Sequence, residues 1–201
     1  TNGSATTETQ ARFDERPNNS IDYTTPEKSG FKGTLQYATN TDAATTATND
    51  NDLISLGVNY AQGPVFVGLG YGKASFLSTA TTPVVGDDPS VVRLAGYYDL
   101  DAWRFTGFWQ TVAGTLTNGN ADEDVYGLGV RFRNDAWVYK FQTYQLSAEA
   151  DEKDVGLFAL GAEYTLQKGI TLYADYATTS NDDGRGLTPY REGRGDNLTI
   201  A

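Results

Sequence analysis

The chain has 201 residues, enough for one large domain or two small ones, and no apolar run approaches the length of a transmembrane helix. Cys, His and Met are absent, which excludes a thiol nucleophile, a Ser-His pair and a His- or Cys-ligated zinc; we expect no enzyme, no cofactor and no metal site. The net charge of -11 disfavours nucleic acid as a partner.

Alternation of apolar and polar residues at period two predicts about ten strands and the start of an eleventh. Abundant Gly (22) and Tyr (13), with few Pro (6), favour strands joined by tight turns. In chain order the predicted strands are 19–26, 31–39, 53–61, 65–77, 91–99, 102–113, 124–133, 136–147, 155–166 and 170–180, with 197–201 beginning the last.

Short and long connections alternate along the whole chain. The segments EKSG, QGP, DLD, ND (Asn134-Asp135) and QKG are short, and long polar stretches rich in Asp and Glu separate them. Tight turns therefore collect at one end of the strands and large loops at the other, as in outer-membrane β-barrels. The alternative is a soluble antiparallel meander or sandwich, in which loop lengths usually mix at both ends.

One face of the predicted strands is continuously apolar, with aromatic residues gathered near both strand ends and aliphatic residues between them. Two aromatic girdles around an apolar band are typical of a barrel wall that faces lipid. The predicted lipid-interface aromatics are Tyr60, Tyr71, Tyr98, Trp103, Trp109, Tyr126, Trp137, Tyr164 and Tyr176.

The opposite face is expected to be polar or small and to line a water-filled lumen, because a closed core would not tolerate so many unpaired cations. The predicted basic wall consists of Lys32, Arg93, Arg104, Arg131 and Lys140, and the predicted lumen acids are Asp22, Glu163 and Asp175. Ten or eleven strands do not close a barrel of this kind, so we expect further strands outside the sequence.

Two segments resemble the general diffusion porins of the neisserial and related proteobacterial type. RFDERPNNSIDYTTPEKSGFKGTLQYA (Arg12 to Ala38) is similar to the end of their constriction loop and the hairpin after it, and LGAEYTLQKGITLYADYA (Leu160 to Ala177) is similar to their penultimate hairpin. The resemblance implies a sixteen-stranded trimeric porin whose sixth strand is the first one visible here. Residues 1–18 would end the constriction loop and 19–201 would form the barrel.

In that family an acidic constriction loop faces a basic wall across a narrow eyelet. The resemblance implies that the loop end carries Glu8, Arg12, Asp14, Glu15 and Arg16. The expected fold is an all-β, transmembrane, antiparallel up-and-down β-barrel in the outer membrane of a Gram-negative bacterium.

The expected function is a water-filled channel for passive diffusion of small hydrophilic solutes and ions. The expected partners are those solutes, outer-membrane lipid, lipopolysaccharide and two further copies of the chain. An anion-preferring, substrate-selective channel and a structural or adhesin barrel stay open as alternatives.

Overall fold

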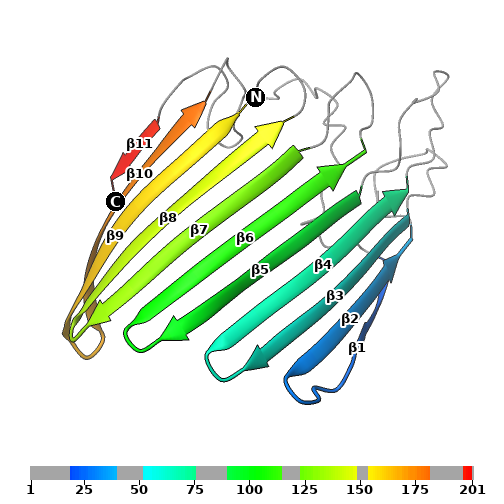
Figure 1. Ribbon diagram of the computed structural model, residues 1–201, viewed down its shortest axis with the longest axis horizontal. Helices are drawn as coiled ribbons and strands as arrows, with labels where there is room; N and C mark the ends of the chain where they lie inside the picture. The colour runs from blue at the N-terminus through cyan, green and yellow to red at the C-terminus, as the bar shows by residue number, and fades with distance from the viewer. Residues whose placement is uncertain are drawn as a thin grey trace.

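The computed structural model describes residues 19–39, 52–75, 90–114, 123–148 and 154–181, together with the backbone of 197–200. Eleven antiparallel strands form one sheet, and their order in the sheet is their order in the chain (Figure 1). The described residues contain no helix long and apolar enough to cross a membrane. The strands are β1 (Ser20–Thr24), β2 (Phe31–Ala38), β3 (Asp52–Gln62), β4 (Val65–Ser75), β5 (Ser90–Leu100), β6 (Trp103–Ala113), β7 (Glu123–Asn134), β8 (Trp137–Ala148), β9 (Val155–Gln167), β10 (Ile170–Asn181) and β11 (Asn197–Ile200).

The predicted all-β, up-and-down architecture is confirmed, with strand ends within about two residues of the predicted ones. The sheet is long, curved and open, with β1 and β11 at its two edges (Figure 1). Short connections join β1 to β2, β3 to β4, β5 to β6, β7 to β8 and β9 to β10, and in Figure 1 they all lie along the lower edge of the sheet.

The tight turns depend on residues that tolerate a left-handed backbone. Asp101 and Asp135 have φ of 49° and 50°, and Gly63 and Gly169 have φ of 58° and 86°. Asp and Gly adopt this region at the lowest steric cost, so the turn sequences select two-residue hairpins. One predicted turn shifts by a residue: Asn134 pairs with Trp137 and ends β7, so the turn consists of 135–136.

The two faces of the sheet differ in chemistry. We call the face that carries Arg104, Arg131 and Lys140 the cationic face, and the other the apolar face. Leu128 on the apolar face is 66% exposed, and each of the strands β1 to β10 exposes large aliphatic or aromatic side chains on this face. The sheet therefore has no continuous buried core.

The few buried side chains lie on the cationic face, near the strand ends opposite the tight turns. They are Ala38, Ala74, Val91, Val155 and Thr179. An extensive exposed apolar surface is unstable in water and stable in lipid, so this distribution indicates that the apolar face contacts a membrane.

The aromatic residues of the apolar face follow lines that cross the strands obliquely. When register partners are followed across the sheet, Tyr60 on β3 lies opposite Gly107 on β6. On β6, the aromatic residue near the tight turn is Trp103, which is four positions closer to that turn than Gly107. Tyr164 on β9 lies level with Asn134 on β7, about two positions past Phe132, on the turn side. The line near the tight turns thus moves by about one residue per strand.

The line near the other strand ends moves in the same direction. Tyr71 on β4 lies level with Thr111 on β6, two positions beyond Trp109, whereas Tyr176 on β10 lies level with Val130 on β7, four positions short of Tyr126. A shift of about 3.3 Å for each strand spacing of about 4.8 Å corresponds to a strand tilt of about 35°. Transmembrane barrels have strand tilts of about 35–45°, so both aromatic lines are level in a membrane plane.

Candidate functional site: the cationic face

Three cations stand side by side on the cationic face, near the tight-turn ends of β6, β7 and β8. Arg104 on β6 is the register partner of Arg131 on β7, which is in turn the partner of Lys140 on β8. The row continues to Asp99 on β5 at one end and, past Gly161 on β9, to Asp175 on β10 at the other. Like charges directly opposite one another repel, so the row requires acidic neighbours or water.

Asp99 neutralises the first cation. Nε and Nη2 of Arg104 donate to Oδ1 and Oδ2 of Asp99, each at 2.6 Å, which is the bidentate geometry of a strong guanidinium–carboxylate pair. The guanidinium carbon also lies 3.9 Å from the ring centroid of Tyr97, within cation–π range. Arg104 is therefore held in one orientation against the wall.

Glu163 on β9 neutralises the third cation, because Lys140 Nζ donates to its Oε1. The carboxylate of Asp175 lies across Gly161 towards the same lysine, where a Cβ at Gly161 would fall on Asp175 Oδ1. Arg131, between the two paired cations, makes no hydrogen bond or ion pair within the described part of the chain. Among the residues that the structure describes, no carboxylate pairs directly with the guanidinium of Arg131.

The other two members of the predicted basic wall lie apart from this row. Arg93 on β5 is about six positions from Asp99, or roughly 20 Å along the strand, and its Nε donates to Gln110 Oε1 at 2.6 Å. Lys32 on β2 lies four strands from β6, level with Phe108. After correction for the tilt of about one residue per strand, Lys32 comes to about the same membrane depth as Arg104, whereas Arg93 is nearer the long connections.

The expectation that these cations are unpaired is wrong for Arg104 and Lys140. Sequence reasoning named Glu163 but missed Asp99, because the strand was expected to end there and DLD was interpreted as a turn. Asp22, the remaining predicted lumen acid, accepts from Gln36 Nε2 at 2.7 Å and from Ser20 Oγ at 3.2 Å and pairs with no cation of the described strands. Residues 1–18, with Glu8, Arg12, Asp14, Glu15 and Arg16, lie outside the described residues, as do the long acidic connections.

The cationic face was expected to carry only polar or small side chains, but it also carries aromatic ones. Phe66 on β4 stacks on Tyr97 with ring centroids 5.3 Å apart and an interplanar angle of 16°, and Phe108 on β6 meets Tyr144 on β8 edge-on at 6.1 Å. The alternation pattern hides Phe66 and Phe108 because each stands beside bulky residues of the apolar face. Val91, Val125, Leu146, Val155 and Leu157 extend the apolar part of this face towards the long connections.

The predicted interface aromatics all lie on the apolar face. Near the tight turns they form a packed belt in which Trp103 meets Phe132 at 4.3 Å and Trp137 meets Tyr164 at 4.7 Å between ring centroids. Tyr60 and Tyr98 continue this line, and Tyr71, Trp109, Tyr126 and Tyr176 form the other.

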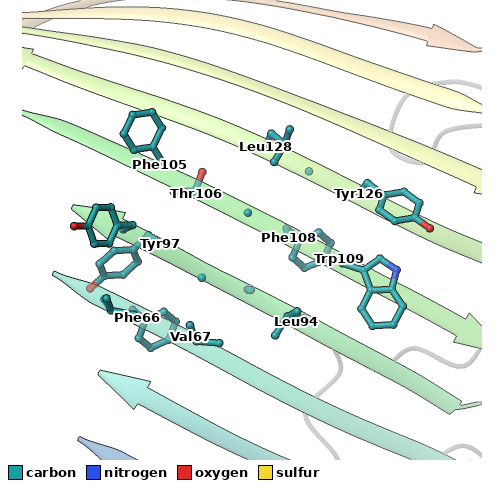
Figure 2. A pocket seen from close by; sticks show the side chains of 16 residues that line it. Phe66, Val67, Leu94, Tyr97, Phe105, Thr106, Phe108, Trp109, Tyr126 and Leu128 are labelled. Atoms are coloured by element: carbon teal, nitrogen blue, oxygen red, sulfur yellow. The ribbon is translucent and has the colours of Figure 1, made fainter. Parts of the chain in front are cut away.

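A hollow of about 710 Å³ interrupts the apolar face between the two lines. Its floor is the cross-strand pair Gly96 and Gly107, and Leu94, Trp109 and Leu128 stand around it (Figure 2). A Cβ at Gly96 would lie 2.7 Å from the Phe66 carbonyl oxygen, but one at Gly107 would meet nothing within 4 Å. Close backbone packing therefore explains the first glycine and not the second.

Comparison with known proteins agrees with this geometry. The model of the Gram-negative porin family matches residues 1–184. No curated protein matches the chain. Among solved structures, the chain is similar to the anion-selective porin from Comamonas acidovorans, with a TM-score of 0.72, 22% identity and coverage of 92% of this chain and 54% of that one.

It is also similar to the outer-membrane expressed OmpT of Vibrio cholerae, with a TM-score of 0.61, 18% identity and coverage of 92% and 63%. A loop L8 deletion mutant of OmpT gives a TM-score of 0.60 at 19% identity, with coverage of 90% and 60%. The chain thus spans about half to two thirds of the length of these structures, and at such identities the likeness concerns the fold.

Proposed function

The chain belongs to the family of Gram-negative porins, outer-membrane β-barrels, and on this premise we propose that it forms the larger part of the wall of a water-filled diffusion channel. The observation that carries the proposal is the division between the two faces. The apolar face exposes its side chains between two aromatic lines that are level in a membrane plane, and the opposite face carries the cation row. Such a wall is stable between lipid and water.

We further infer that the channel prefers small anions. Asp99 and Glu163 pair with two of the three adjacent cations, and Arg131 is left to meet a passing solute. Asp175 brings the sum of charges along the row to zero, but it lies three strands away from Arg131, beyond Lys140. An anion attracted by a single guanidinium is bound weakly enough to leave again, which conduction requires. The anion selectivity stated for the Comamonas acidovorans porin supports this reading.

Membership in a porin family supports passive transport rather than an enzymatic reaction. The homotrimer and the contacts with lipopolysaccharide belong to the same proposal, as do the roles of Lys32 and Arg93 in the channel wall. Within the described strands, nothing specifically favours the structural or adhesin alternative.

The test is the reversal potential of the full-length protein in a planar lipid bilayer under a potassium chloride gradient. We expect stepwise conductance and a reversal potential of the sign that chloride permeation produces. Stepwise conductance with a reversal potential of the sign that potassium permeation produces would contradict the anion preference but not the channel itself. Absence of conductance from correctly folded protein would contradict the channel itself.

A further inference from the structure

Four aromatic rings on the cationic face form contacts that a channel for hydrated ions alone does not require. They form two pairs, Phe66 with Tyr97 and Phe108 with Tyr144. Figure 2 shows Phe66, Tyr97 and Phe108 on strands β4, β5 and β6, and the register places all of them on the face of Arg104. Large rings facing water are costly, so their presence on this wall requires an explanation.

The second pair lies on the same face as Arg131 and on the neighbouring strands. Phe108 and Tyr144 share a register row with Gly127, and Arg131 lies two rows away on the same face, about 13 Å along the strand. The ring of Tyr144 lies across Gly127 towards Phe108, because a Cβ on this glycine would fall on that ring. Tyr144 stays 36% exposed, so part of its ring remains accessible.

The row between the rings and the guanidinium is small and polar. It consists of Thr106, Gly129 and Gln142, and the Thr106 hydroxyl lies where a Gly129 side chain would be. On the described strands, no aromatic or aliphatic side chain of this face therefore lies between Phe108 and Arg131. The wall presents, in order, an aromatic surface, a hydrogen-bonding surface and a positive charge.

We propose that this stretch of wall binds aromatic carboxylates, with the ring of the solute against Phe108 and Tyr144 and its carboxylate on Arg131. Aromatic rings prefer offset or edge-on contact with other rings, and Arg131 offers a planar fork that matches a carboxylate. Arg104 and Lys140 are already paired with carboxylates, and Arg93, in the row on the other side of Phe108, donates its Nε to Gln110, so the proposal assigns the carboxylate of the solute to Arg131. The proposal rests on the proposed channel and names a class of solute that it favours.

The first pair of rings, Phe66 and Tyr97, is not assigned to the ring of the solute. The guanidinium of Arg104 covers Tyr97, and Phe66 stacks on the same ring, so these rings are already in contact with wall groups. They form the border of the site near the tight turns. Phe108 and Tyr144 are therefore the rings to test.

The experiment measures how benzoate and acetate reduce the chloride current of the full-length porin in planar bilayers. We expect benzoate to reduce the current at a concentration about fivefold lower than acetate. Phe108→Leu and Tyr144→Leu should bring this ratio close to one while the chloride current is retained, and Phe108→Tyr should keep it. Tyr173→Leu removes an exposed ring of the same face on β10, outside the site, and should leave the ratio unchanged.

Arg131→Gln should weaken benzoate and acetate together, because both lose the same partner. Equal effects of the two anions on the unmodified porin would overturn the proposal, as would a ratio that survives the loss of both rings. A loss of chloride current equal to the loss of benzoate binding would show that the rings only support the wall. Absence of any current from the unmodified, folded porin would instead refute the channel.

Discussion

Removing the carboxylate that neutralises Arg104 should make the channel more anion-selective. In Asp99→Asn the guanidinium keeps its place beside Tyr97 but gains one uncompensated unit of charge. An ion that passes about 10 Å from this charge feels about 0.4 kcal/mol in water, since the Coulomb energy is 332/(εr). The local chloride concentration then rises about twofold and that of potassium falls about twofold, so the permeability ratio changes about fourfold.

The predicted change in selectivity should depend on the salt concentration, because salt screens the added charge. At 0.01 M salt the Debye length is about 30 Å and the added charge acts almost unscreened, whereas at 1 M it is about 3 Å. The change in chloride-to-potassium ratio should therefore be seen at low salt and disappear at high salt. Reversal potentials of single channels at several ionic strengths measure it directly.

The matched control is the double variant Asp99→Asn/Arg104→Gln. It removes both charges of the pair, so the net charge of the wall equals that of the unmodified protein, and the ratio should return to the starting value. An unchanged ratio in Asp99→Asn, or a double variant that stays as selective as the single one, would refute the assignment of this face to the ion path.

Three further predictions concern the unpaired cation and the two faces. Arg131→Gln should lower the chloride-to-potassium ratio about fourfold at low salt, whereas Lys140→Gln/Glu163→Gln, which removes a neutral pair, should leave the reversal potential unchanged. Gly107→Ala should be tolerated or raise the free energy of unfolding by about 0.5–1 kcal/mol. Gly96→Ala should lower the free energy of unfolding, because of the two glycines only Gly96 has backbone where the new Cβ would lie. Urea titration of the refolded barrel distinguishes the two variants. Leu128→Arg, at the middle of the apolar face, should cost about 2–4 kcal/mol in the same titration, and Gln142→Arg on the cationic face should cost little; equal costs would contradict the assignment of the faces.

The strands could be predicted from the sequence because the period-two pattern is physically strict. A strand that lies between lipid and water must alternate along its whole length, so an error of one residue would put Arg131 into the hydrocarbon. The turns are equally constrained, since Asp101, Asp135, Gly63 and Gly169 need a left-handed backbone. These local requirements place ten strands and their connections without any knowledge of pairing.

The neighbours across the sheet could not be predicted, because parity identifies a face and not a register. The predicted basic wall treats Arg93 as equivalent to Arg104, but the register puts them far apart on different rows. Asp99 was missed for a related reason: the predicted strand ended at this residue, and only the pairing of Asp99 with Arg104 and of Leu100 with Trp103 shows that β5 continues past it. Phe108 was missed because the neighbouring Trp109 already supplies the apolar residue that the period-two pattern requires at this point of the strand.

The pairing of two cations out of three has a functional consequence that follows from electrostatics alone. Three unpaired cations on adjacent strands, about 5 Å apart, would repel one another and hold an anion strongly. Asp99 and Glu163 remove that repulsion at Arg104 and Lys140 and hold both side chains in ion pairs along the wall. In the proposed channel, the charge on Arg131 attracts an anion without trapping it. The acids of this wall would then set the strength of the proposed anion site as much as the cations do.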